Sequence, residues 1–253
     1  MSSRVDYGID SPAIVAGLFL LSGFGFAGRW VWHIFGRPPL FGEIALFVAG
    51  LYFLIAAGGM VLYSKAGKLR IRDQILDVIP WRGDERVLDA GCGRGLLLIG
   101  AARRLTTGRA IGLDRWKAGA LTGNRPAAVL HNACLEGVLD RVEAKEGDVR
   151  KLPFADCSFD VVVSNFVVHE LKLRAEREQM LREIARVLKP GGRLALVDFI
   201  FTRECVRVLQ AIGLADAKRA RAGSFVSFWL SAVLNLGLVQ TYLVTASKPR
   251  VTA

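Results

Sequence analysis

The sequence predicts an α/β protein with a doubly wound sheet of seven strands, preceded by two transmembrane helices. Three observations indicate this fold class. From residue 86 onward, short apolar segments alternate with segments of helical spacing, as in a sheet that is covered by helices on both faces. A glycine-rich turn joins the first of these strands to the helix that follows it. Two long uncharged segments occupy most of the first 63 residues.

The uncharged segments are expected to form a membrane anchor over residues 1–64. Residues 44–63 carry no charge and no proline, and a helix of about 20 residues crosses a hydrocarbon core of about 30 Å. Residues 12–35 begin with an uncharged run and end in Trp30, Trp32 and Phe35, which favour the membrane interface. A cleaved signal peptide is the weaker interpretation, because bulky residues stand where small cleavage residues are expected.

The distribution of basic residues predicts how this anchor is oriented. Arg29 and Arg37 flank the turn between the two segments, whereas four basic residues closely follow the second segment: Lys65, Lys68, Arg70 and Arg72. The positive-inside rule therefore places both termini in the cytoplasm, at a bacterial inner membrane. A formal net charge of +11 could bind either nucleic acid or an anionic lipid surface. Because two membrane spans are expected, the membrane surface is the favoured partner. Four cysteines without metal or disulfide spacing fit a reducing compartment.

Residues 65–82 are expected to form a basic amphipathic linker helix. Apolar residues recur at helical spacing between basic ones, so the helix either lies at the bilayer surface or packs on the edge of the sheet. The segment 224–237 is uncharged and apolar. It is too short for a third span, which leaves a lid that dips into the membrane interface, or core packing.

The glycine-rich turn, residues 89–95 (D-A-G-C-G-R-G), predicts a ligand site. Gly91, Gly93 and Gly95 let the backbone approach a ligand closely, and the following helix offers its unpaired N–H groups. Asp89 is placed to meet a cationic or hydroxyl-bearing group, and Cys92 is a small apolar filler rather than a nucleophile. A dinucleotide site requires G-x-G-x-x-G, but the third glycine position falls on Leu96. A turn without any nucleotide is the structural alternative.

Carboxylates follow the next two strands. Asp114 ends the strand at 110–113, where it can accept hydrogen bonds from ribose hydroxyls. Trp116 either covers a ligand face or packs in the core. Asp148 ends the strand at 141–148 and can accept a hydrogen bond from an adenine amino group. The β-branched run at 159–165 predicts a strand that is buried on both faces. The remaining elements are expected as helices at 96–105, 178–188 and 202–212 and strands at 193–199, 215–222 and 239–247.

These motifs, in this order, resemble the class I S-adenosylmethionine-dependent methyltransferases. The resemblance covers residues 67–250 and depends on D-x-G-C-G-x-G, on L-P-F followed by F-D, and on L-K-P-G-G. The layout is similar to a bacterial group that includes quinone- and arsenite-methylating enzymes. It implies a seven-stranded Rossmann-like methyltransferase domain over residues 83–253, with S-adenosyl-L-methionine as the cofactor.

The resemblance also implies roles for individual residues. Asp89 and the loop 91–95 would hold the methionine end of the cofactor, Asp114 the ribose, and Asn165 would line the methyl donor. Asp148 and Val149 would hold the adenine. The implied cofactor-binding set is Asp89, Gly91, Cys92, Gly93, Gly95, Asp114, Arg115, Trp116, Asp148, Val149 and Asn165. The chain lacks the N-P-P-Y type of tetrad and has S-N-F-V-V-H-E there, which argues against nucleic acid as a substrate.

His169 and Glu170 are the catalytic candidates, because they follow the fourth strand at the edge where open parallel sheets bind ligands. A base is needed only if the acceptor loses a proton, and the pKa range of histidine suits that task. The alternative is that His169 has no catalytic role and only shapes the pocket. The three histidines are far apart, so no metal site is expected.

The predicted function is methyl transfer from S-adenosyl-L-methionine to a lipophilic or interfacial small molecule at the membrane. Two alternatives remain: a soluble small molecule or a protein as acceptor, with the anchor serving localisation, or a non-catalytic cofactor-binding module. Removal of residues 1–64 is expected to leave cofactor binding intact.

Overall fold

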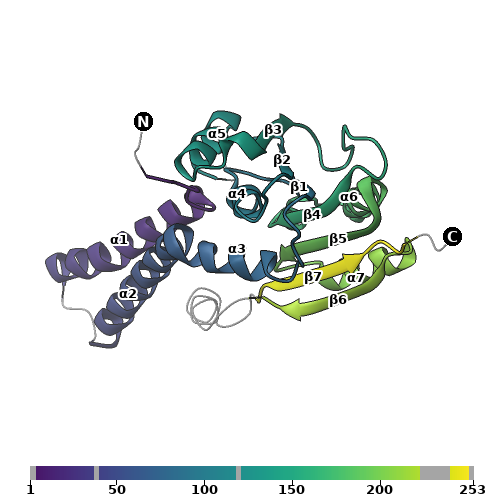
Figure 1. Ribbon diagram of the computed structural model, residues 1–253. Coiled ribbons are helices and arrows are strands. Elements are labelled where there is room, and N and C mark those ends of the chain that lie inside the picture. The colour runs from purple at the N-terminus through teal and green to yellow at the C-terminus, as the bar shows by residue number, and fades with distance from the viewer. Residues whose placement is uncertain (1–3, 37–39, 118–120, 223–239, 251–253) are drawn as a thin grey trace.

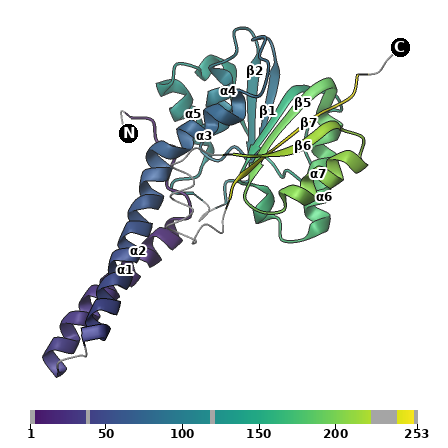
Figure 2. The same cartoon turned by 90° about the horizontal axis from the view of Figure 1, so that it is seen from below.

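The computed structural model describes residues 4–36, 40–117, 121–222 and 240–250. It combines a seven-stranded mixed sheet, helices on both faces of that sheet, and a two-helix hairpin that projects from one side (Figure 1; Figure 2). This arrangement confirms the predicted α/β class and the number of strands. The segment 224–237 lies outside the described residues, so neither of its two interpretations is tested.

The sheet has the order β3-β2-β1-β4-β5-β7-β6. Strands β1 to β5 run parallel, and β7 lies antiparallel between β5 and β6. The chain order reverses at β1, which lies between β2 and β4, and ligands of open α/β sheets bind at such a switch point. The strands are β1 (Arg86–Ala90), β2 (Arg109–Asp114), β3 (Val142–Glu146), β4 (Phe159–Asn165), β5 (Leu188–Asp198), β6 (Ala215–Arg221) and β7 (Tyr242–Ser247).

Helices cover both faces of the sheet through two separate apolar clusters. One face carries α3 (Lys68–Leu76), α4 (Leu96–Ala102) and α5 (Pro126–Leu135), and the other carries α6 (Arg174–Val187) and α7 (Thr202–Ala211). Two short 3-10 turns, η2 (Leu139–Arg141) and η3 (Val168–Glu170), complete this part. The packing of α3 against the sheet agrees with the second interpretation of the linker helix.

Several boundaries differ from the sequence prediction, among them those of α6 and β5. The helix expected at 178–188 begins at Arg174 and ends at Val187. The L-K-P-G-G segment, which was expected to end this helix before the strand at 193–199, opens β5, because Leu188 already pairs with Phe159 of β4 ahead of a register shift. Leu188 and Arg193 pair with β4 at the two ends of this segment, and the proline and glycines between them form an irregularity in β5 in which Gly191 has a φ of +81°.

The hairpin consists of α1 (Pro12–Phe35) and α2 (Leu40–Leu62) and continues through one π-helical turn, η1 (Tyr63–Gly67), into α3. The two helices touch closely, since a Cβ on Gly25 would lie 2.8 Å from the Cα of Gly50. Large apolar side chains cover the outer faces, among them Leu20 at 65% and Phe24 at 72% exposed. By length and composition, Pro12–Ile34 and Leu40–Lys65 are candidate membrane spans.

The segment before α1 does not belong to the hairpin. Residues 5–11, the N-terminal strap, lie against the sheet domain beside α5 and the loop that follows β2. Tyr7 is buried in the same apolar cluster as α3 and α4. The strap thus connects the sheet domain to the start of α1, although the sequence analysis assigned residues 1–64 as a whole to the anchor.

Candidate active site

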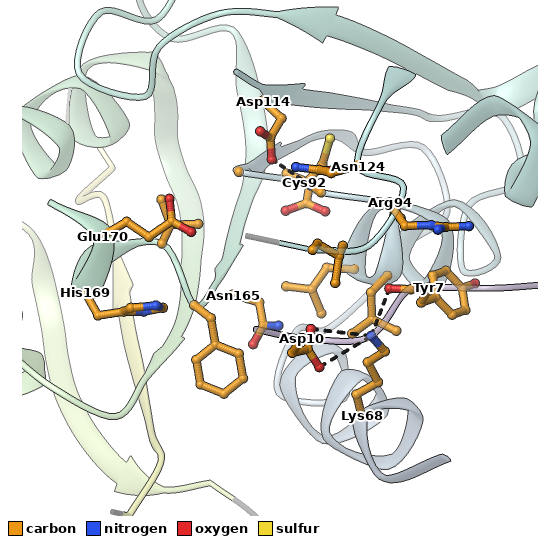
Figure 3. A pocket seen from close by; sticks show the side chains of 18 of the residues that line it. Tyr7, Asp10, Lys68, Cys92, Arg94, Asp114, Asn124, Asn165, His169 and Glu170 are labelled. Atoms are coloured by element: carbon orange, nitrogen blue, oxygen red, sulfur yellow. Dashed lines mark hydrogen bonds and ion pairs between the residues drawn. The ribbon is translucent and has the colours of Figure 1, made fainter. Parts of the chain in front are cut away.

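A cavity of about 470 Å³ opens at the carboxyl ends of β1, β2 and β4 (Figure 3). All of the sequence-predicted site residues line it except Gly95 and Trp116. Its volume falls within the range of about 300–1,000 Å³ that is typical of small-molecule sites. The parallel strands therefore bring together side chains from four separate motifs.

The glycine loop adopts backbone conformations that L-residues rarely take. Gly91, Gly93 and Gly95 have φ values of +85°, +53° and +88°. The N–H groups of Gly91 and Cys92 both donate to the carbonyl of Leu113, at 2.7 and 3.1 Å, which folds the loop over the end of β2. A Cβ on Gly91 would lie 2.2 Å from Cγ2 of Val167, so the loop and the segment after β4 are in direct contact.

Gly95 has a packing role rather than a place in the cavity wall. It precedes α4, and a Cβ there would lie 3.1 Å from Ile99 and 3.2 Å from Val129. The missing side chain lets α4 approach α5 closely. The expectation that Gly95 touches the cofactor through its backbone stays a prediction.

Asp89 is a buried carboxylic acid. It is 1% exposed, and Oδ2 accepts a hydrogen bond from the N–H of Leu98 at 2.8 Å. Burial raises the pKa of Asp89 to about 8, and the nearby negative charge of Asp114 acts in the same direction. A cationic ligand group beside Asp89 would favour its ionised form.

Asp114 organises the glycine loop as well as facing the cavity. Its two carboxylate oxygens accept hydrogen bonds from the N–H groups of Gly93 and Trp116, both at 2.7 Å. The indole N–H of Trp116 donates to the carbonyl of Gly93 at 2.9 Å, and the ring packs against the apolar cluster. Of the two interpretations of Trp116, this placement agrees with core packing.

Asp148 is held by arginines. Its carboxylate accepts hydrogen bonds from the side chain of Arg150, the shortest at 2.6 Å, and lies 3.4 Å from Nη1 of Arg115. The hydrogen bonds from Arg150 lower the pKa of Asp148 to about 2. Arg150 also pairs with Glu176 at the start of α6. Sequence reasoning did not identify Arg150, although it stands two residues after Asp148.

Two amide oxygens in the cavity wall lack a hydrogen-bond partner in the part of the chain that the structure describes. Among the described residues, Oδ1 of Asn165 and Oδ1 of Asn124 are buried and accept no hydrogen bond. Buried polar atoms are nearly always paired in folded proteins. These two acceptors therefore fit a ligand that is rich in donors, such as the amino and hydroxyl groups of a nucleoside.

His169 and Asp198 form a hydrogen-bonded pair. The backbone N–H of His169 donates to Oδ2 of Asp198 at 3.1 Å, and Nδ1 lies 3.3 Å from the same oxygen. Asp198 is 0% exposed, and the imidazole lies near the rings of Phe166 and Phe199. A buried carboxylate at Nδ1 fixes the ring, as a general base requires.

Asp198 was missed by the sequence analysis, although a signal existed. It is the last residue of an apolar strand, as Asp114 is, and Asp89 stands one residue before the end of β1.

Glu170 lines the cavity, and burial raises its pKa, with Asp114 acting in the same direction. In the described part of the chain, no group of three His, Cys, Asp or Glu side chains is arranged to hold a metal ion.

Part of the cavity wall comes from segments that the motifs did not indicate. These segments are the N-terminal strap, the end of α2, η1 and α3, and they contribute Tyr7, Asp10, Ser11, Met60, Tyr63, Ser64, Lys68 and Ile71. These segments belong to the predicted anchor, residues 1–64, and to the predicted linker helix, residues 65–82.

Known proteins share this fold and these motifs. Residues 88–196 match a family described as a methyltransferase domain. The 27-O-demethylrifamycin SV methyltransferase of Amycolatopsis mediterranei (strain S699) is 34% identical over 176 residues, which cover 69% of this chain and 57% of that relative. The demethylmenaquinone methyltransferase of Lactiplantibacillus plantarum is 35% identical over 128 residues, 50% of each chain. This chain thus spans between half and three fifths of the length of these curated relatives.

A solved structure agrees in fold. Geranyl diphosphate C-methyltransferase from Streptomyces coelicolor A3(2), in complex with S-adenosyl-L-homocysteine, superposes with a TM-score of 0.57 at 17% identity, over 76% of this chain and 79% of that one. The family match over residues 88–196 and the 34% identity to the Amycolatopsis relative, together with this fold, show that the chain contains a class I S-adenosylmethionine-dependent methyltransferase domain. S-adenosylmethionine, rather than a dinucleotide, is its cofactor.

Proposed function

We propose that this chain is a membrane-anchored enzyme that transfers a methyl group from S-adenosylmethionine to a lipophilic or interfacial small molecule. The observation that carries the proposal is the composition of the cavity wall. The cofactor motifs line the cavity together with Met60 and Tyr63, where the apolar hairpin ends. An acceptor bound there would lie next to the end of the anchor.

The hairpin supports membrane insertion through its outer surface. Large apolar side chains such as Ile14, Leu20, Phe24 and Ile55 are exposed on it, and water would oppose that exposure. Basic residues follow the second helix, which favours a cytoplasmic position for the methyltransferase domain at a bacterial inner membrane.

The acceptor side of the cavity is apolar and aromatic. Phe166, Val167 and Phe199 line it near His169, and the exposed side chains Leu173 and Ile200 follow the ends of the same strands. One relative is named for a quinone substrate and another for a rifamycin derivative. An apolar, ring-containing acceptor would suit this surface.

The chemistry requires positioning and, for some acceptors, a base. S-adenosylmethionine supplies an electrophilic methyl group that is transferred by in-line displacement. Enzymes accelerate such transfers mainly by aligning the reactants in a dry pocket. Asp114, Asp148 and the glycine loop would hold the cofactor. His169 would remove a proton from the acceptor through Nε2, while Asp198 holds the ring and stabilises the imidazolium that forms.

Methyl transfer from labelled S-adenosylmethionine into a total membrane-lipid extract, compared with a water-soluble metabolite extract, tests the proposal. The proposal predicts label in the organic phase, and less label at limiting cofactor concentration with Asp114→Ala as the cofactor-site control. Label confined to the aqueous phase would contradict a lipophilic acceptor. Label in neither phase, with cofactor binding intact, would favour a protein acceptor or a non-catalytic module.

The anchor is tested separately with a pair of matched variants. Leu20 and Phe24 lie near the middle of the candidate span Pro12–Ile34 and face outward. A lysine at the centre of a span opposes insertion by about 2.5–3.5 kcal/mol. Leu20→Lys/Phe24→Lys should therefore abolish flotation with vesicles, whereas Leu20→Ala/Phe24→Ala should float. Equal flotation of both variants would refute insertion of this helix.

A further inference from the structure

The N-terminal strap is attached to the sheet domain by specific hydrogen bonds rather than by apolar contact alone. Asp10 pairs with Leu121 in an antiparallel bridge, and the N–H of Ile9 donates to Oγ1 of Thr122 at 2.8 Å. Asn132, which is fully buried, contacts the backbone of Asp6 through both amide atoms, at 3.0 and 3.2 Å. The strap therefore occupies a defined position beside the cavity.

Lys68 fastens the strap from the opposite side. Its ammonium donates to the carbonyls of Tyr7 and Gly8, at 2.8 and 2.7 Å, and lies 3.5 Å from the carboxylate of Asp10 (Figure 3). An ammonium has three donors, and the strap uses all three. Lys68 is 5% exposed, and burial lowers its pKa while Asp10 opposes the shift. A cation in such a position is tolerated only because these partners are present.

The strap is also linked to the cofactor motif. Nη2 of Arg94, inside the glycine loop, lies 3.3 Å from the carboxylate of Asp6. Nη1 of the same arginine donates to the carbonyl of Thr122 at 2.7 Å. The loop that meets the cofactor and the strap that faces the cavity are thus held by the same side chain.

We propose that the N-terminal strap is a wall of the cofactor site, built by Tyr7, Asp10 and Ser11, and that Lys68 is the positioning residue that holds it there. The three strap residues line the same cavity as Asp89 and Asp114. Lys68 acts on the cofactor through the strap. The inference depends on the cofactor site alone and is independent of the acceptor and of membrane insertion.

The test compares Lys68→Met with Lys218→Met in the full chain, reconstituted in nanodiscs. Lys218 is an exposed lysine of β6, remote from the cavity, and serves as the matched control. Lys68→Met leaves two buried carbonyls without their donor, so we expect the Kd for S-adenosylmethionine to rise at least tenfold. Hydrogen exchange at residues 5–11 should become faster, while exchange in β1 and β4 stays unchanged. An unchanged Kd would overturn the proposal.

A disulfide that fastens the strap shows whether Lys68 acts by positioning the strap or by contacting the cofactor directly. Asp10 and Leu121 are opposite residues of the antiparallel bridge, so Asp10→Cys/Leu121→Cys places two thiols within disulfide reach. The exposed Cys134 and Cys157 are replaced by serine beforehand. Because Asp10 itself lines the cavity, the reference is the same disulfide variant with Lys68 intact. In the Lys68→Met background, oxidation should restore the affinity for S-adenosylmethionine to that of the reference, and reduction should lower it again. Failure of the verified disulfide to restore affinity would show that Lys68 does not act through the strap.

Discussion

The contact between the glycine loop and the segment after β4 predicts a specific outcome for Gly91→Ala. The new methyl group would meet Cγ2 of Val167 at 2.2 Å, and Cγ1 and Cβ of the same residue at 3.2 and 3.3 Å. Rotation of one side chain cannot relieve all three contacts. Either the loop or the segment that leads to His169 must therefore move.

The loss of folding stability in Gly91→Ala has two parts, and the structure allows them to be measured separately. A non-glycine residue at a φ of +85° costs about 1–2 kcal/mol. Overpacking against Val167 adds about 1–3 kcal/mol. Gly213 provides a control for the first part, because its φ is +86° and a Cβ there would meet nothing within 4 Å. Gly213→Ala should therefore cost only the backbone part and leave cofactor binding unchanged.

The assay is thermal unfolding together with calorimetric titration of S-adenosylmethionine. Gly91→Ala should raise the Kd at least tenfold, which corresponds to about 1.4 kcal/mol. Adding Val167→Ala should recover the packing part of the stability loss, giving a favourable coupling of about 1–3 kcal/mol in the double-mutant cycle. If Gly91→Ala and Gly213→Ala behave alike in both measurements, the close approach does not exist.

Three further predictions concern the carboxylates and His169. The pKa of Asp89 is raised from 3.8 to about 8, so its contribution to the stability of the unliganded chain is complete below pH 4 and lost as the pH rises through 8. Binding of the cationic cofactor at pH 7 should release protons, seen as a buffer-dependent calorimetric enthalpy that Asp89→Asn removes; no buffer dependence would contradict this. Asp114→Asn should weaken cofactor binding by about 1–3 kcal/mol, and an unchanged Kd in the same titration would refute its role. Where the acceptor loses a proton, His169→Gln should lower kcat by about 10²–10⁴-fold, and Asp198→Asn should also lower kcat. The Kd for the cofactor should stay unchanged in both variants. Full turnover of His169→Gln would exclude His169 as the general base.

The cofactor motifs were predictable because each is local in the chain. Each motif lies within about ten residues of sequence and combines a buried strand with a glycine turn or with a carboxylate near the end of the strand. The parallel sheet then brings these motifs to one edge. Asp89, Asp114, Asp148 and Asn165 were placed on the same cavity for that reason. Element boundaries were less predictable, since Leu188 pairs with β4 despite the proline and glycines that follow it.

Tertiary structure alone decided which side chains meet across long chain separations. His169 and Asp198 are 29 residues apart, and Asp6 and Asn132 are 126 residues apart. Hydrogen bonds of this kind leave no periodic pattern in the sequence, because either partner alone is an ordinary polar residue. The strap and Lys68 could be recognised only once folding had buried the lysine and set two backbone carbonyls and a carboxylate around it.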